Sequence, residues 1–285
     1  MLLSFRDRGF LYGDAVCDTT RTFVHRLFKL PDHIERLYCS LGYVRIAPRI
    51  SPAEMCAITE EEFERNRHLL GPEDDCRVSQ RISRGLLHPD GEQATEDGPT
   101  VIVECTPLPF RQRAHLYTDG IRVNVPSMQW TPPEAPASRA GTTNYLDMMI
   151  ADQETTSLDP DAWAVLFDIH GNLADGRLAT PRAHHVLPGI SRQTVLELAA
   201  PLGIPCDETV LDLYDAYNAD EAFLTSTSLC ICPVRSINGS RIGSEQVFGT
   251  ITHRLIEAYV RLVDCDFVAQ YRRQLDGGGR RMSCH

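Results

Sequence analysis

Strand-like and helix-like patterns alternate along almost the whole chain, and this alternation limits the folds that the chain can adopt. In the first third, residues 17–30 are rich in β-branched and aromatic residues around a polar break at His25, which predicts a β-hairpin. Ser51 followed by Pro52 is typical of a helix start. The expected elements are the hairpin at 17–30, helices at 31–44 and 51–71, and strands at 76–85 and 100–108.

The remainder of the chain predicts a second, larger unit built in the same way. Its expected elements are strands at 120–128 and 162–172, helices at 142–155 and 191–203, a strand, loop and strand over 221–234, and a helix at 248–265. Ser191 is the expected N-cap of the helix at 191–203. We therefore expect an α/β (α+β) protein with a small domain at 1–112, a linker at 113–119, a large domain at 120–272 and a disordered tail at 273–285.

Composition and charge exclude several classes of partner. No apolar run approaches the length of a membrane span, and the first residues do not form a secretory signal, so we expect a cytoplasmic protein that does not bind membranes. The formal net charge of −11 disfavours binding to nucleic acid. The cysteines are scattered without a C-x-x-C pair, which favours reduced thiols and gives no pattern for a metal site.

Two short motifs indicate an anion site. In "LPGISRQTVLELA" (187–199), a Pro-Gly turn leads into a helix whose first N–H groups and dipole attract negative charge. In "FLTSTS" (223–228), hydroxyl groups crowd the loop that follows an apolar run. Each motif alone is also compatible with a simpler structure, a plain helix cap in the first case and a common turn in the second.

Five segments, taken in order, resemble class IV pyridoxal-phosphate aminotransferases, the family of branched-chain and D-amino-acid aminotransferases and aminodeoxychorismate lyases. The matching segments are "DRGFLYGDAVCDTTRTF" (7–23), "LPDHIERL" (30–37), "SRAGTTNYLDMM" (138–149), "LPGISRQTVLELA" (187–199) and "DEAFLTSTSLCICPVRSINGSRIG" (220–243). The order and spread of these motifs make the resemblance far more specific than any one of them.

The resemblance implies the fold type IV architecture, with the site in the cleft between the two domains, and a homodimer. It implies pyridoxal or pyridoxamine 5′-phosphate as cofactor and an amino acid or 2-oxo acid, or another phosphorylated ligand, as partner. It also implies roles for individual residues. The cofactor's phosphate would be bound by Arg36, Ile190, Ser191, Ser226 and Thr227. Tyr145 would contact the cofactor's phenolic oxygen, and Asp175 would pair with its ring nitrogen. Tyr12 and Arg84 would contact the substrate.

The chain departs from the family at the catalytic lysine. The position three residues before Asn144, where many members carry the lysine, is Gly141, and a one-residue offset would place it at Ala140. Lys29 is the only lysine in the chain. Arg139 corresponds to an arginine that precedes the lysine in the family, and a guanidinium does not act as an amine nucleophile.

The chain also lacks a strand's length of residues between Asp175 and the Leu-Pro-Gly loop, and it has Cys17 where the family commonly has an aromatic residue. Three functions remain open. The chain is an aminotransferase homologue with altered or residual activity that binds the cofactor non-covalently. Alternatively, it is a pseudoenzyme that binds a phosphorylated ligand, or a lysine-independent lyase or isomerase using Asp175, His184 or His185. Restoring a lysine at position 141 is the change expected to separate these hypotheses.

Overall fold

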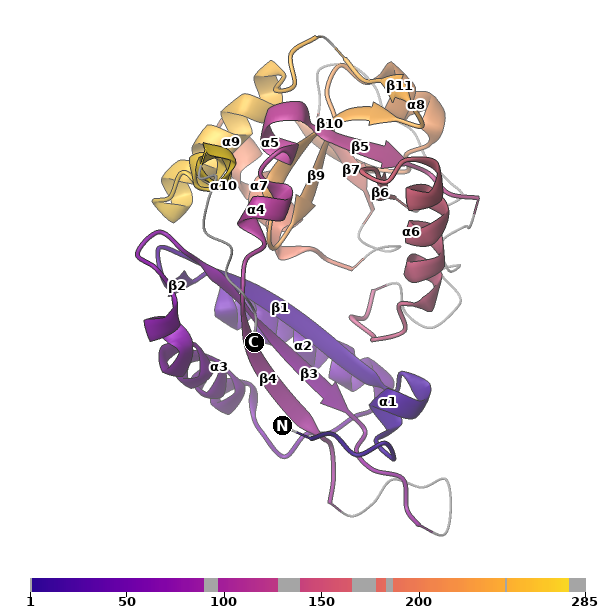
Figure 1. The fold of residues 1–285 in the computed structure, drawn as a ribbon, viewed down its shortest axis with the longest axis vertical. Helices are drawn as coiled ribbons and strands as arrows, with labels where there is room; N and C mark the ends of the chain where they lie inside the picture. The colour runs from indigo at the N-terminus through magenta and orange to yellow at the C-terminus, as the bar shows by residue number, and fades with distance from the viewer. Residues whose placement is uncertain are drawn as a thin grey trace.

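The computed structural model describes residues 2–89, 97–127, 139–165, 178–182, 187–243 and 245–276. Figure 1 shows two lobes, with strands β1 to β4 in one and the later strands in the other. This agrees with the predicted arrangement of a smaller N-terminal and a larger C-terminal α/β unit. The small lobe holds an antiparallel sheet of order β2-β1-β3-β4. Its elements are α1 (Arg8–Tyr12), β1 (Ala15–Phe23), β2 (Arg26–Leu27), α2 (Leu30–Val44), α3 (Pro52–Asn66), a 3-10 turn (Arg67–Leu69), β3 (Cys76–Ser83) and β4 (Val101–Pro107).

The two long helices of the small lobe form for the reasons that the sequence indicates. In α3, the Ser51 hydroxyl accepts a hydrogen bond from the Glu54 N–H at 3.3 Å, and the Glu54 carboxylate accepts from the Ser51 N–H at 2.8 Å. In α2, the residues Ile34, Leu37 and Leu41 repeat at helical spacing and are buried. They pack with Val16 of β1 and Ile82 of β3.

The large lobe is built around β10, which is buried along most of its length. Its main sheet has the order β11-β10-β5-β6, β9 also pairs with β10, and β7 and β8 form a separate parallel pair. The elements are α4 (Phe110–Arg113), α5 (Leu116–Asp119), β5 (Ile121–Asn124), α6 (Leu146–Leu158), β6 (Trp163–Ala164), β7 (Leu178–Pro181), α7 (Ile190–Ala199), β8 (Cys206–Thr209), α8 (Leu213–Asn218), β9 (Phe223–Ser226), β10 (Cys230–Ile237), β11 (Ser240–Arg241), α9 (Thr250–Val263) and α10 (Phe267–Asp276).

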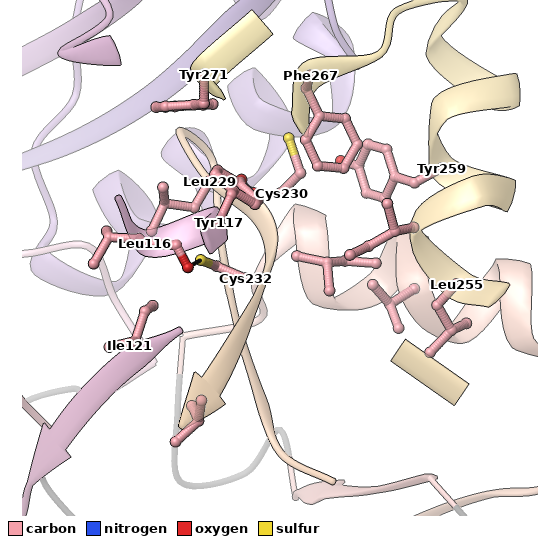
Figure 2. Packing of buried hydrophobic residues seen from close by; sticks show 14 of the residues in the cluster. Leu116, Tyr117, Ile121, Leu229, Cys230, Cys232, Leu255, Tyr259, Phe267 and Tyr271 are labelled. Carbon is pink, nitrogen blue, oxygen red and sulfur yellow. Dashed lines mark hydrogen bonds between the residues drawn. The ribbon is translucent and has the colours of Figure 1, made fainter. Parts of the chain in front are cut away.

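Aromatic side chains fill the core of the large lobe. Figure 2 shows Tyr117, Tyr259, Phe267 and Tyr271 around β10. Tyr117 and Tyr271 have ring centroids 5.0 Å apart, and Tyr259 meets Phe267 edge-on at 5.6 Å. The last two helices therefore contribute directly to this core.

The structure differs from the expected linker and tail. Residues 113–119, predicted to be a linker, include α5, and its Leu116 and Tyr117 are buried in the large-lobe core. The predicted tail begins at residue 273, but α10 continues to Asp276, since its Gln270 and Tyr271 contact the small and the large lobe respectively. The rest of the predicted tail, 277–285, lies outside the described residues, so its disorder stays a prediction. Across the described ranges, no helix is both long and apolar enough to cross a membrane.

Candidate functional site

One face of α2 carries a row of polar side chains that connects the small lobe to other segments. Lys29, His33, Arg36 and Ser40 follow one another at intervals of three or four residues, so they lie on the same side of the helix. Together they contact several distant parts of the chain. Their partners are Glu197 for Lys29, Asp18 for His33 and Arg36, Pro188 for Arg36, and Gly141 for Ser40.

Arg36 is the member of this row that contacts the Leu-Pro-Gly loop, and hydrogen bonds hold it in place. Asp18 on β1 receives hydrogen bonds from Arg36 Nε at 2.8 Å and from Nη2 at 2.8 Å. The third guanidinium nitrogen, Nη1, donates to the carbonyl oxygen of Pro188 at 3.0 Å. Because Asp18 holds one edge of the guanidinium, the other end is aimed at the start of α7.

Asp18 remains ionised in a buried position because it has two partners. Burial alone would raise the pKa of the Asp18 carboxyl group, but hydrogen bonds from His33 and Arg36 and the positive charge of Arg36 outweigh burial and lower that pKa. The His33 Nδ1 atom lies 2.7 Å from the carboxylate. The ionised Asp18 carboxylate thus fixes the orientation of the Arg36 guanidinium.

The start of α7 differs from the sequence-based expectation in one respect. The N-cap is Gly189 and not Ser191, and Gly189 provides no side-chain hydrogen bond to the first turn. Ser191 lies inside the first turn, where its hydroxyl donates to the carbonyl oxygen of Ser226 at 3.0 Å. This bond brings the end of β9 against the end of α7 whose N–H groups are not capped by a side chain.

The predicted phosphate residues are therefore brought together in part by observed bonds. Arg36 reaches Pro188, which precedes Ile190 by two residues, and Ser191 reaches Ser226. The Ser226 hydroxyl accepts from the N–H of Leu229 at 3.0 Å, which closes a tight turn containing Thr227 between β9 and β10. A cation, an open helix end and a hydroxyl-bearing turn meet at this place, as an anion site requires.

The segment that resembles the lysine segment packs against β1. The Gly141 carbonyl accepts from the N–H of Cys17 at 2.7 Å, and the Gly141 N–H donates to the Ser40 hydroxyl at 3.1 Å. A Cβ atom added to Gly141 would lie 2.5 Å from the Cys17 carbonyl oxygen. Any side chain at position 141 would therefore force the backbone apart, so a lysine there is not a simple restoration, whereas the neighbouring Ala140 already carries a Cβ.

Tyr145 belongs to this segment and contacts Cys17. Its hydroxyl oxygen lies 3.3 Å from the Cys17 sulfur, while the side chain as a whole remains 41% exposed. Burial of the hydroxyl end, together with the nearby Cys17 thiol, raises the pKa of Tyr145 well above its ordinary value. At neutral pH the phenol is protonated and can donate a hydrogen bond to an oxygen atom beside it.

Lys29 lies away from this segment. It is in the left-handed conformation immediately before α2, and its Nζ atom contacts the Glu197 carboxylate at 2.7 Å. Glu197 lies seven residues beyond Ile190, which corresponds to about 10 Å along α7. The lysine therefore joins α2 to the middle of α7 and does not point at the helix end where the anion motifs meet.

The two predicted substrate residues occupy different environments. Arg84 forms a two-pronged pair with Asp14, with distances of 2.7 Å and 3.0 Å, and it also donates to the carbonyl oxygens of Val44 and Arg45 at the end of α2. Tyr12 is 56% exposed on α1. Arg84 is thus committed to holding the small lobe together, and a substrate contact for either residue stays a prediction.

Several residues from the sequence analysis lie outside the described ranges. These are Asp175, His184 and His185, together with most of the region in which the strand is missing. Conversely, Asp18, His33 and Ser40 were not singled out from sequence. The spacing of His33, Arg36 and Ser40 on one helix face was the available signal, but it does not show what each side chain contacts.

Comparisons with known proteins place the whole arrangement in a family. The family model described as amino-transferase class IV matches residues 15–237. A protein of Methanocaldococcus jannaschii named "putative branched-chain-amino-acid aminotransferase" is 30% identical over 269 residues, covering 90% of both chains. The chain belongs to the class IV aminotransferase family.

Solved structures of this family share the fold. The branched-chain amino acid aminotransferase of Escherichia coli superposes with a TM-score of 0.81 at 24% identity, covering 92% of this chain and 90% of that one. A T.th. branched-chain amino acid aminotransferase with pyridoxamine 5′-phosphate has a TM-score of 0.78 at 22% identity, covering 92% and 89%. The expected fold type IV architecture is confirmed.

Proposed function

We propose that this class IV aminotransferase homologue binds pyridoxal or pyridoxamine 5′-phosphate without a covalent bond and has weak or no ordinary Schiff-base transaminase activity. The phosphate group would be held by Arg36, the N–H groups of Ile190 and Ser191, and the turn at Ser226 and Thr227. A relative with pyridoxamine 5′-phosphate in its solved structure makes this class of ligand the natural choice.

The residues present fit the phosphate end of such a ligand. The α7 N-terminus is not closed by a capping side chain, because Gly189 is its N-cap. The Asp18 carboxylate holds Arg36 so that its Nη1 end lies at this terminus, 3.0 Å from the Pro188 carbonyl oxygen. A cation, free helix N–H groups and serine hydroxyls together supply the donors that a phosphate dianion needs.

The environment of Gly141 carries the second half of the proposal. Its backbone is hydrogen-bonded on both sides, and a Cβ would collide with the Cys17 carbonyl at 2.5 Å. The only lysine, Lys29, pairs with Glu197. These observations support a site without a side-chain amine, and so without the group that the family uses to hold the cofactor and move protons.

The described side chains can still bind and orient a ligand. A bound pyridoxal 5′-phosphate would supply an aldehyde able to accept an amino group and a ring that withdraws electrons from the reacting carbon. Tyr145 keeps its proton at neutral pH and would donate it in a hydrogen bond to an oxygen of the ligand. An amino acid or 2-oxo acid is the expected second ligand. General acid–base groups contribute about 10²–10⁴-fold, so loss of the lysine predicts a correspondingly slow reaction.

We also propose that two copies associate through α1 and the start of α6. Phe10, Tyr12, Leu146 and Met149 are exposed apolar side chains on these two helices. The helices adjoin, since Thr143, just before α6, donates to the Gly13 carbonyl at 3.1 Å just after α1. An apolar surface of this kind is typical of an interface. Light scattering should give the mass of a dimer, and Leu146→Asp should yield monomers.

A titration tests the proposed ligand binding. Pyridoxal 5′-phosphate added to the purified protein should bind saturably, keep the absorption of a free aldehyde and leave completely on dialysis. Pyridoxal without the phosphate should bind far more weakly. If pyridoxal 5′-phosphate does not bind, the proposal is wrong. If the absorption shifts to that of a cofactor covalently attached to the protein and the ligand resists dialysis, the proposal of non-covalent binding is wrong.

A further inference from the structure

In the turn between β9 and β10, backbone carbonyl groups accept hydrogen bonds from side chains on three different elements. The Ser228 carbonyl accepts from Arg21 Nη1 at 2.8 Å and from the Tyr271 hydroxyl at 2.8 Å. The neighbouring Leu229 carbonyl accepts from the Tyr117 hydroxyl. Figure 2 shows Tyr271, Tyr117 and Leu229 beside one another in the core. These bonds fix the direction of the peptide groups that follow Ser228.

Fixing the Ser228 carbonyl has a consequence for Ser226. In a planar trans peptide, the N–H of Leu229 points opposite to the carbonyl of Ser228. That N–H donates to the Ser226 hydroxyl oxygen at 3.0 Å. A hydroxyl group has one hydrogen to donate and can accept through its oxygen. Because its oxygen already accepts from Leu229, the Ser226 hydroxyl keeps its hydrogen for a ligand.

Arg21 is an unusual residue for such a supporting position, because its charge is almost completely buried. The side chain is 1% exposed, and its guanidinium carbon lies 4.0 Å from the centre of the Phe23 ring. Besides Ser228, it contacts Gln270 on α10 at 3.4 Å, and the Asp75 carboxylate lies 3.9 Å away. A buried charge lowers the stability of the folded state unless it is well paired, so the Arg21 guanidinium constrains the geometry of its partners Ser228, Gln270 and Asp75.

The same network ties α10 to the small lobe. Gln270 Nε2 donates to the Asp75 carboxylate at 2.8 Å and to the Glu73 carbonyl at 2.8 Å. Asp75 also accepts from the Thr22 hydroxyl at 2.6 Å, next to Arg21 on β1. The turn is therefore held jointly by β1 of the small lobe and by the C-terminal helix.

We propose that Arg21 and Tyr271 are positioning residues for the phosphate-binding turn, so that α10 is part of the ligand site without touching the ligand. This inference rests on the proposed function, because it requires that the turn binds phosphate. It assigns the Tyr271 hydroxyl a task beyond packing. The Tyr271 ring makes the packing contacts without the hydroxyl, since its centroid lies 4.8 Å from that of Phe110 and 5.0 Å from that of Tyr117.

Tyr271→Phe tests the inference while keeping the aromatic contacts. The full-length variant should bind pyridoxamine 5′-phosphate and inorganic phosphate about 3- to 10-fold more weakly than the unmodified protein, the range expected for losing one hydrogen bond. Arg273→Gln is the matched control. Arg273 lies on the same helix but pairs with Glu73 at the surface, so this variant should keep the original affinity.

Arg21→Lys gives a second, larger change. Lysine keeps the charge but cannot reach Ser228, Gln270 and the Thr22 carbonyl together, so phosphate affinity should fall more than about 10-fold. Urea unfolding of each variant separates positioning from stability. If Tyr271→Phe lowers stability but leaves both dissociation constants unchanged, the inference is overturned. If the unmodified protein binds neither probe, the proposed function fails as well.

Discussion

The phosphate side and the lysine side of the candidate site are built in contrasting ways. On the phosphate side, polar groups are held by other polar groups, as Arg36 is by Asp18 and Ser226 is by Ser191 and Leu229. On the lysine side, backbone occupies the space, because Gly141 packs on Cys17 with no room for a Cβ. One side is preorganised for a charged ligand and the other is closed around a glycine.

Under the proposed function, phosphate binding and covalent attachment of the cofactor depend on different parts of the fold. The phosphate side depends on α2, α7 and the turn after β9, whereas the lysine side depends on the segment before α6. A change in one part therefore need not disturb the other. A protein can lose the covalent chemistry and keep the anion-binding elements, and the proposed function takes this form.

Adding an amine to the lysine side should have the largest effect. Ala140→Lys should create a covalent adduct with pyridoxal 5′-phosphate where the unmodified protein forms none, because the elements proposed to hold the phosphate are unchanged in this variant. Absorption spectroscopy detects the adduct, and a transaminase assay with several amino acids should show a gain of about 10²-fold or more.

Gly141→Lys is the comparison that sharpens this experiment. Its Cβ meets a backbone carbonyl at 2.5 Å, so we expect lower stability and little or no adduct formation. An adduct in Gly141→Lys but not in Ala140→Lys would contradict our interpretation of the segment and would favour the alignment that sequence alone suggested.

Removing the charge on the phosphate side should have the next largest effect. Arg36→Gln should weaken binding of pyridoxamine 5′-phosphate roughly 10- to 100-fold, since hydrogen bonds to charged groups contribute about 1.5–3 kcal/mol. Calorimetric titration measures this directly. Arg65→Gln, which removes an exposed arginine paired with Glu61 on α3, is the control and should bind normally. Equal affinity in both variants would remove Arg36 from the site.

Gly141→Ala should affect stability more than phosphate binding. The added methyl group would overpack the contact with Cys17, at a cost of about 1–3 kcal/mol in the free energy of unfolding. Denaturant unfolding measures the cost, and the dissociation constant for inorganic phosphate should stay within about twofold of the original. A large loss of phosphate affinity would mean that the two sides are not separable.

The smallest expected effect is a change with pH in the free energy of unfolding, caused by the Asp18 carboxyl group. The pKa of Asp18 is lowered in the folded protein, whereas an unfolded aspartate has a pKa of about 3.9. The carboxylate therefore contributes stability above about pH 4, and this contribution disappears as the pH falls through the folded-state pKa. Asp18→Asn should flatten this part of the stability profile. An unchanged profile would show that the ion pair contributes little.

Sequence patterns predicted those elements whose signals are local. The Ser51 capping box and the hairpin around His25 appear as expected, because caps and turns depend on a few neighbouring residues. The motifs at 187–199 and 223–228 are joined by the bond from Ser191 to Ser226. Their meeting followed from the family resemblance and not from spacing along the chain.

Long-range packing decided what the sequence could not predict. Ser191 was expected to cap α7, but its hydroxyl bonds to Ser226, and Gly189 takes the capping position. Part of the expected linker forms α5, whose Tyr117 joins the aromatic core, and α10, whose Tyr271 joins the same core, extends past the expected start of the tail to Asp276. A local pattern contains no information about such partners, and the same is true of the buried Arg21.

We propose above all that the protein holds a phosphorylated ligand without a covalent bond to the chain. Borohydride reduction of the protein saturated with pyridoxal 5′-phosphate, followed by intact-mass measurement and peptide mapping, tests it most directly. We predict an unchanged protein mass beside a saturable, dialysable ligand. A stoichiometric increase by one reduced cofactor, mapped to Lys29, would contradict the account.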